Sequence, residues 1–113
     1  MDQELQQKIQ QFQSGSQQLQ ALAQQRQQMD MLAAENHRAL EAIEEMADDA
    51  TVFRSVGSLL LQETVAAAKE RLNNDNETME IRVKRMKQQE ESLQTSLQAL
   101  QEELQKALGQ PEA

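Results

Sequence analysis

The chain has no cysteine, one proline and three glycines, and aromatic residues make up only 2% of its 113 positions. Without cysteine it has neither disulfides nor thiolate metal sites, which fits a reducing compartment and excludes a disulfide-stabilised secreted scaffold. The scarcity of aromatics, together with a hydrophobic content of 38%, excludes a thick globular core. We therefore expect a single domain, 1–113, that is stabilised by something other than a large core.

Long apolar runs and positive charge are also scarce. No window approaches the roughly 20 apolar residues that cross a bilayer, and the start, MDQELQQKIQ, lacks the features of a signal peptide. We expect a soluble, unprocessed, cytoplasmic chain with no membrane partner. The formal net charge is -8, and nucleic-acid affinity rests on Lys and Arg neutralising phosphates, so the sequence predicts no nucleic-acid partner.

Residues for catalysis or metal binding are missing as well. His37 is the only histidine, and no nucleophile with a neighbouring base or phosphate-cradling glycine loop can be assembled. The run from Asn73 has the alternating acids of a calcium loop, but Thr78 stands where its glycine belongs and Lys84 where its last glutamate belongs. Solvation is expected for the acidic cluster Glu41, Glu44, Glu45, Asp48 and Asp49. The sequence predicts no enzyme activity, no metal and no cofactor.

Helical heptad spacing is what the sequence has in abundance. Apolar or small residues three or four apart predict two amphipathic helices, over 4–47 and 65–108, each with a narrow seam. The seam of the first is predicted to hold Leu5, Ile9, Phe12, Ser16, Leu19, Ala23, Met29, Leu32, Asn36, Leu40, Ile43 and Ala47. The seam of the second is predicted to hold Ala68, Leu72, Asn76, Met79, Val83, Met86, Glu90, Leu93, Leu97, Leu100, Leu104 and Ala107 or Leu108.

Two helices of equal length on either side of a central stretch favour an antiparallel pair, because a narrow seam needs a partner helix. Ser14, Gly15 and Ser16 are poor helix formers, so the turns before them are expected to fray. Asn76 occupies a seam position, where a buried asparagine can fix register at some cost in stability. A loosely packed turn around Asn73–Asn76 is the alternative. Residues 109–113 read as a flexible tail.

The central stretch TVFRSVGSLLLQ, from Thr51, predicts a β-hairpin over 51–63. It is rich in strand formers, and Gly57 supplies the positive φ that tight hairpin turns require. With Val56 and Gly57 as the turn, the register would pair Phe53 with Leu60 and Val52 with Leu61. Asp48 and Asp49 are expected to end the first helix, and Thr64 is expected to cap the second.

A two-stranded hairpin is marginal alone in water, and its open edges invite further strands. Both faces of this one are partly apolar, and two slender helices cannot cover them. We therefore expect hairpins of several chains to assemble into a shared sheet or barrel, whereas a mere connector would need only a few polar residues. The residues predicted to mediate assembly are Val52, Phe53, Val56, Gly57, Leu59, Leu60 and Leu61.

These motifs resemble the prefoldin β subunit family. Residues Val52–Leu61 follow the family's hairpin pattern, and Met79-Glu80-Ile81-Arg82 followed by Met86 and Gln89-Glu90 follows the start of its second helix. The chain departs from the family at Asn76, where an apolar residue is usual, and at Phe53, where tyrosine is common.

The resemblance implies a mostly α subunit, a long antiparallel coiled coil joined by one β-hairpin, in a heterohexamer of two α and four β subunits with a β-barrel body. It also implies an ATP-independent chaperone that holds unfolded proteins at the coiled-coil tips and passes them to a group II chaperonin. The tip residues expected to contact clients are Leu5, Ile9, Phe12, Leu104 and Leu108, with Met1 and Met29 adding adaptable contacts.

Two other classes of protein stay open on the residues alone. The helices by themselves would suit a coiled-coil tether or scaffold, although the apolar hairpin argues against it. A transcript-cleavage factor of the bacterial type carries acids at the turn of a helical hairpin to hold magnesium, and Asp48 and Asp49 flank the centre here. That class has a tight polar tip and a separate globular domain, which this sequence lacks.

Overall fold

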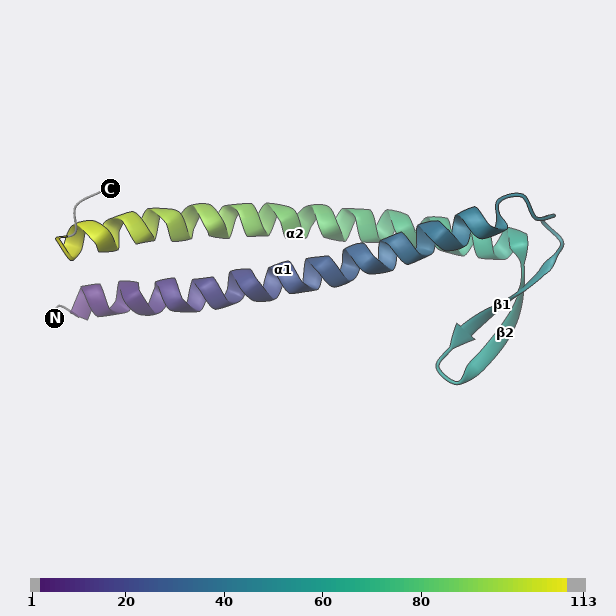
Figure 1. The fold of residues 1–113 in the computed structure, drawn as a ribbon, viewed down its shortest axis with the longest axis horizontal. Coiled ribbons are helices and arrows are strands. Elements are labelled where there is room, and N and C mark those ends of the chain that lie inside the picture. The colour runs from purple at the N-terminus through teal and green to yellow at the C-terminus, as the bar shows by residue number, and fades with distance from the viewer. Residues whose placement is uncertain (1–2, 110–113) are drawn as a thin grey trace. The chain divides into compact units, whose positions relative to one another are not determined.

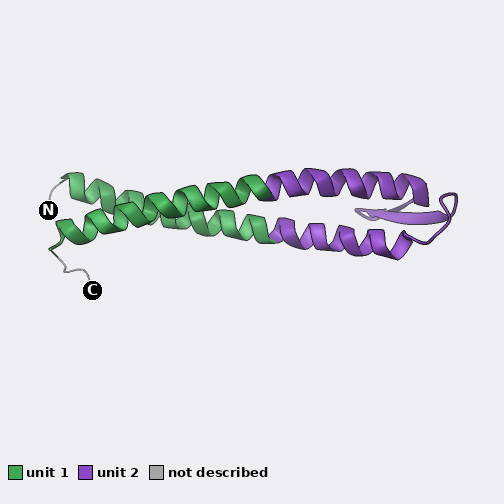
Figure 2. Ribbon diagram, turned by 90° about the horizontal axis from the view of Figure 1, so that it is seen from above, with its two compact units in different colours: residues 1–27, 84–113 green, residues 28–83 purple. Residues whose placement is uncertain are grey.

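The computed structural model describes residues 3–109 and contains two long helices and one antiparallel hairpin, which confirms the predicted fold class. In chain order the elements are α1 (Gln3–Ile43), β1 (Thr51–Val56), β2 (Leu59–Thr64) and α2 (Val65–Ala107) (Figure 1). They divide into two compact units (Figure 2). Unit 1 pairs α1 up to Gln27 with α2 from Lys84, and unit 2, residues 28–83, contains the hairpin.

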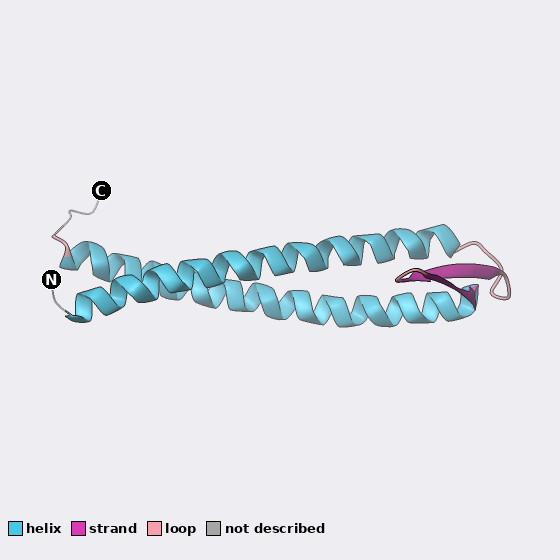
Figure 3. Ribbon diagram, turned by 90° about the horizontal axis from the view of Figure 1, so that it is seen from below, coloured by secondary structure: helices cyan, strands magenta, loops and turns pink. Residues whose placement is uncertain are grey.

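In unit 1 the two helices run antiparallel, with the first turn of α1 beside the last turn of α2 (Figure 3). The seam of α2 follows the prediction, since Met86, Glu90, Leu93, Leu97 and Leu100 are all buried or half-buried. The seam of α1 differs at one position: Gly15 is buried and Ser16 is exposed. Counting from Leu5, an unbroken 3-4 repeat passes through Gly15, and the helix continues through this glycine without interruption.

Gly15 is where the two helices of unit 1 approach most tightly. A methyl group built on Gly15 would come within 2.6 Å of Leu97 Cδ2 and 3.8 Å of Leu93 Cδ1. Leu97 is itself buried, so its side chain fills the space that a residue larger than glycine would occupy. The glycine is therefore a packing residue as well as a poor helix former.

Gly15→Ala is expected to show strong coupling to Leu97→Ala. Alanine favours the helix by about 1 kcal/mol over glycine, but in the native chain this gain is offset because Leu97 must move. With Leu97 truncated the full gain should appear. Thermal or urea unfolding of the two single variants and the double variant measures the coupling, and additive effects would mean that Leu97 moves aside without cost.

Unit 2 has a compact buried core near the hairpin, made by Val65, Ala68 and Leu72 of α2. On α1 the half-buried positions of this unit are Met29, Ala33, Asn36, Leu40 and Ile43. The prediction that Leu32 lies in the seam is wrong, because its side chain is 52% exposed. The 3-4 repeat selects the smaller Ala33 and leaves Leu32 on the flank. Ala47, also predicted in the seam, is exposed beyond the end of the helix.

Asn76 lies in the seam of unit 2 and is only 6% exposed. Its side-chain Nδ2 and Oδ1 are buried without a hydrogen-bond partner among the described residues. Helix α2 continues unbroken through residues 73–76, which excludes a loose turn at this point. Of the two readings of Asn76, the buried polar seam residue is the one that holds, and it costs free energy because its amide is desolvated.

Helix α1 ends at Ile43, four residues before the predicted end at 47 and before Asp48 and Asp49, which were expected to end it. A turn follows at once, with the Met46 N–H donating to the Ile43 carbonyl at 3.1 Å. The Lys69 ammonium donates to the Glu44 carbonyl at 3.2 Å. Cations favour helix C-terminal carbonyls, so α2 itself helps to stop α1.

The first turn of α2 is capped by the segment that precedes it. Thr64 acts as the N-cap, as predicted, with its hydroxyl accepting from an α2 N–H. Three successive N–H groups are satisfied at 2.9 to 3.1 Å: Val65 by the Ala50 carbonyl, Ala66 by the Asp48 carbonyl and Ala67 by Thr64 Oγ1. The loop after α1 and the start of α2 are thereby held together beside the hairpin.

The hairpin register differs from the predicted one. Phe53 pairs with Gln62 and Val52 with Glu63, two residues away from the expected partners Leu60 and Leu61. The turn is formed by Gly57 and Ser58, and Gly57 alone has positive φ, at 59°, which is the pattern of a type II′ turn. Side chains alternate with a period of two, so a shift of two residues keeps every side chain on its predicted face.

Candidate functional site

The β1–β2 hairpin presents two faces of different composition. Directly paired residues of an antiparallel sheet lie on the same face. The first face carries Val52, Arg54, Val56, Leu59, Leu61 and Glu63. The second face carries Thr51, Phe53, Ser55, Leu60, Gln62 and Thr64. Each face thus contains large apolar residues, and no single helix of the chain can cover both.

The apolar side chains of the hairpin are mostly exposed to solvent. Phe53 is 66% and Leu60 72% exposed on the second face. On the first face Val56, Leu59 and Leu61 are exposed, whereas Val52 and Arg54 are half-buried. Of the seven residues predicted to mediate assembly, only Val52 is partly covered by its own chain. Contiguous exposed apolar surface of this kind marks interaction sites.

Both outer edges of the hairpin are open. The sheet has two strands in the order β1-β2, and within residues 3–109 no further strand pairs with either. Each edge therefore offers backbone N–H and C=O groups that another strand could pair with. Figure 1 shows the hairpin standing to one side of the neighbouring helices, so these edges are accessible. Isolated two-stranded sheets are marginal in water, and partner strands would stabilise this one.

A two-point ion pair fixes β2 to α2. Arg71 Nη2 donates to Glu63 Oε1 at 2.6 Å, and Arg71 Nε lies 3.5 Å from Glu63 Oε2. The hydrogen bond from Arg71 lowers the pKa of Glu63 below its ordinary value, the charges of Arg71 and Arg54 add to this effect, and partial desolvation opposes it. The pair fixes the direction in which the hairpin leaves α2, and with it the orientation of the apolar faces.

Glu63→Gln is expected to reduce stability at pH 7 and to flatten part of its acid dependence. Because the folded pKa lies below the unfolded value, the ion pair stabilises the fold above pH about 4.5, and this contribution is lost as the pH falls through the folded pKa. The melting temperatures of the native chain and the variant should therefore converge below about pH 4.5. Glu80→Gln, at an exposed position of α2, controls for the loss of one charge. Parallel curves across the whole pH range would contradict the expectation.

The predicted client-binding residues lie in unit 1, at the end where α1 begins and α2 finishes. Leu5, Ile9, Phe12 and Leu104 are half-buried in or beside the seam, and Leu108 is 50% exposed just after α2. Met1 and residues 110–113 of the predicted tail lie outside the described residues. Met29 is half-buried in unit 2, so it does not join the group that was predicted for the tip.

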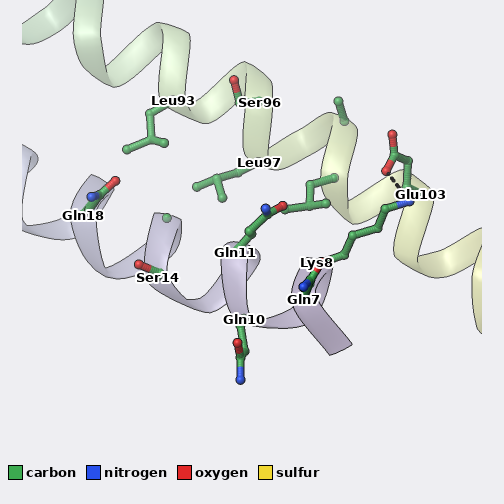
Figure 4. Close-up of a pocket in the computed structure, with 13 residues that line it drawn as sticks. Gln7, Lys8, Gln10, Gln11, Ser14, Gln18, Leu93, Ser96, Leu97 and Glu103 are labelled. Atoms are coloured by element: carbon green, nitrogen blue, oxygen red, sulfur yellow. Dashed lines mark ion pairs between the residues drawn. The ribbon is translucent and has the colours of Figure 1, made fainter. Parts of the chain in front are cut away.

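An open groove of about 1030 Å³ runs along one flank of unit 1 (Figure 4). Its floor contains Gly15, Leu93, Leu97 and Leu100. Polar side chains form its walls: Gln7, Gln11, Ser14 and Gln18 on α1, and Ser96 and Glu103 on α2. Lys8 and Glu103 form an ion pair across it at 3.2 Å. Sequence analysis did not single out these glutamines, although their spacing on one helix face could have revealed the stripe.

A buried ion pair closes the seam of unit 1 further along the helices. Arg26 Nε donates to Glu90 Oε2 at 2.6 Å, and the two side chains are only 24% and 15% exposed. Glu90 was predicted as a seam residue from its heptad position, and Arg26 supplies the countercharge that such a position requires. Charged seam pairs of this kind specify which residues face each other in a coiled coil.

Comparison with known proteins places this arrangement in a family. The family model described as prefoldin subunit matches residues 6–111. The chain belongs to the prefoldin subunit family. The match covers both helices almost entirely and the whole hairpin, so the family assignment and the fold agree on the same residues.

Prefoldin relatives match the chain along nearly its full length. A prefoldin subunit beta from Methanosarcina acetivorans is 40% identical over 106 residues, covering 94% of this chain and 91% of that protein. One from Thermococcus kodakarensis is 37% identical over 103 residues, covering 91% and 88%. The crystal structure of the prefoldin beta subunit from Thermococcus strain KS-1 matches with a TM-score of 0.83 at 34% identity, covering 97% of this chain and 96% of that one. The predicted resemblance to the prefoldin β subunit is confirmed.

Two searches of the described residues concern other kinds of site. None of the helices within residues 3–109 is long and apolar enough to span a membrane. Within the same residues, no group of three His, Asp or Glu side chains is arranged to hold a metal ion. The hairpin and the groove are therefore the features from which a prefoldin function is argued below.

Proposed function

We propose that this prefoldin chain is one subunit of an ATP-independent chaperone that holds unfolded proteins and passes them to a group II chaperonin in the cytoplasm. The observation that carries the proposal is the hairpin with exposed apolar faces and two open edges. Such a hairpin has no purpose in a chain that works alone, because it exposes surface that favours burial.

Assembly is proposed to proceed through the hairpins. Strands of several subunits would pair edge to edge, and the barrel so formed would bury Phe53, Leu60 and their neighbours. Full burial of one leucine or phenylalanine side chain stabilises by about 1.5–3 kcal/mol, so several hairpins together supply a strong driving force. We propose the family's arrangement of two α and four β subunits, in which this chain occupies β positions.

Client binding is proposed for the end of unit 1. Leu5, Ile9, Phe12 and Leu104 are half-buried and Leu108 is exposed, so apolar surface is available to proteins that expose their own. Weak, adaptable apolar contacts suit clients without a common sequence. The sequence supplies no phosphate-cradling loop, which supports capture and release without ATP and a role without enzyme activity.

A coiled-coil tether is the alternative that the helices alone would support. A tether requires only that its seam be paired and its ends be anchored, and the seam here is already paired within the chain. It gives no reason for Leu60 to be 72% exposed on a strand with an open edge. The exposed hairpin therefore favours the chaperone subunit.

The proposal is tested by mass and by activity. Light scattering is applied to the chain alone and mixed with a prefoldin α subunit, and the mixture is then added, without ATP, to a chemically denatured enzyme that aggregates on dilution. A hexamer-sized complex that suppresses aggregation is expected. A dimer that ignores the α subunit and leaves aggregation unchanged would favour the tether instead.

A further inference from the structure

The groove of unit 1 has walls of side-chain amides and hydroxyls over a leucine floor. Gln7, Gln11, Ser14 and Gln18 are spaced four, three and four residues apart, which places them in one stripe along α1. In Figure 4 the side chains of Gln11 and Gln18 point toward the α2 side, whereas Gln10 points away. All four stripe residues are exposed, so their polar groups face solvent above buried Leu97.

The groove carries almost no free charge. Between Leu5 and Gln25 the only charged residue of α1 is Lys8, and it pairs with Glu103 of the opposite wall. Electrostatic selection of a strongly acidic or basic ligand is therefore weak. What the walls offer is hydrogen bonding, because each glutamine amide provides two donors and one acceptor oxygen.

A glutamine amide is the same chemical group as a peptide bond, so it pairs with main-chain N–H and C=O groups of any sequence. Folded proteins satisfy these groups internally, whereas unfolded segments expose them. The stripe from Gln7 to Gln18 is about 16 Å long at 1.5 Å per helical residue. That length accommodates about five residues of extended chain at about 3.3 Å each, with alternate side chains pointing toward the leucine floor.

We propose that this groove binds an extended, uncharged segment of an unfolded polypeptide, with Gln11 and Gln18 hydrogen-bonding its main chain and the leucine floor contacting alternate apolar side chains. The inference rests on the proposed chaperone function and specifies its ligand class: the main chain itself is recognised, in addition to exposed apolar side chains. A purely apolar tip would respond to substitutions in the opposite direction, which makes the two separable.

The test uses the full chain and a double variant, Gln11→Leu with Gln18→Leu. The matched control is Gln13→Leu with Gln20→Leu, which has the same spacing and the same helix at exposed positions outside the groove. The probe is a dansyl-labelled decapeptide of alternating leucine and serine. Its partner is the ester analogue, in which alternate peptide N–H groups are replaced by oxygen. Binding is followed by fluorescence anisotropy, and circular dichroism checks that the variants keep their helices.

The native chain is expected to bind the peptide about tenfold more tightly than its ester analogue, the loss expected for two neutral hydrogen bonds. The groove variant should lose about the same factor and no longer distinguish the two probes, and the control variant should match the native chain. Unchanged or tighter binding by the groove variant, or no binding by the native chain, overturns the inference. Aggregation suppression by the unaltered chain with its α partner reports separately on the proposed function, so failure of one is distinguishable from failure of the other.

Discussion

Replacing Leu60 with Asp is expected to abolish assembly of the chain with other prefoldin subunits while its own helices stay folded. Leu60 is 72% exposed in the single chain, so the aspartate is solvated there and costs little. In a barrel the same carboxylate would be buried without a partner, which costs several kcal/mol. A cost of about 3 kcal/mol weakens association more than a hundredfold. Light scattering of the chain mixed with an α subunit measures the loss.

The matched control for Leu60→Asp is Leu32→Asp. Leu32 is also exposed and also lies in unit 2, but on the flank of α1 away from the hairpin strands. It should assemble like the native chain. Circular dichroism should show equal helix content in both variants. Full assembly by Leu60→Asp would mean that the hairpin faces stay exposed to solvent in the complex, which contradicts the barrel.

Asn76→Leu is expected to stabilise the chain. The buried Asn76 amide has no hydrogen-bond partner among the described residues, and an unsatisfied buried polar group costs about 1–3 kcal/mol. Leucine has a similar size, suits the seam and favours the helix. We expect a gain of about 2 kcal/mol and a melting temperature several degrees higher. Thermal unfolding at neutral pH measures it.

Asn74→Leu separates burial from helix propensity in this experiment. Asn74 lies on the same helix two residues earlier and is exposed, so the substitution changes propensity alone and should shift stability by only a few tenths of a kcal/mol. A fall in melting temperature for Asn76→Leu would show that its amide is hydrogen-bonded in solution. The half-buried Asn36 of α1, which the heptad repeat places at the same level of unit 2, would then be the first partner to test.

The seam of α2 was predictable because its heptads are filled with large apolar residues. From Ala68 to Leu104 each predicted position is buried or half-buried. In α1 the apolar residues are sparser and often small, so the choice between neighbours was ambiguous. Leu32 was chosen for its size, but the repeat buries Ala33. Gly15 was read only as a helix breaker, because its contact with Leu97 depends on a residue far along the chain.

The hairpin shows which part of a strand pairing can be read from sequence. Strand-forming residues around Gly57 predicted the hairpin itself and the membership of its two faces. The turn falls on Gly57 and Ser58 instead of Val56 and Gly57, and this moves every pair by two residues. The glycine supplies positive φ at the first turn position as well as at the second, so residue types alone did not decide between them.

The sequence by itself determined the long paired helices, the central hairpin, its apolar surface and the resemblance to prefoldin, because each follows from local periodicity and residue type. Only the tertiary structure decided the turn register, the Glu63–Arg71 pair that orients the strands, the burial of Asn76 and the amide-lined groove beside Gly15. These features depend on which residue of one element meets which residue of another. That choice is made by side-chain volume and charge across the seam, and it leaves no periodic signal in either element alone.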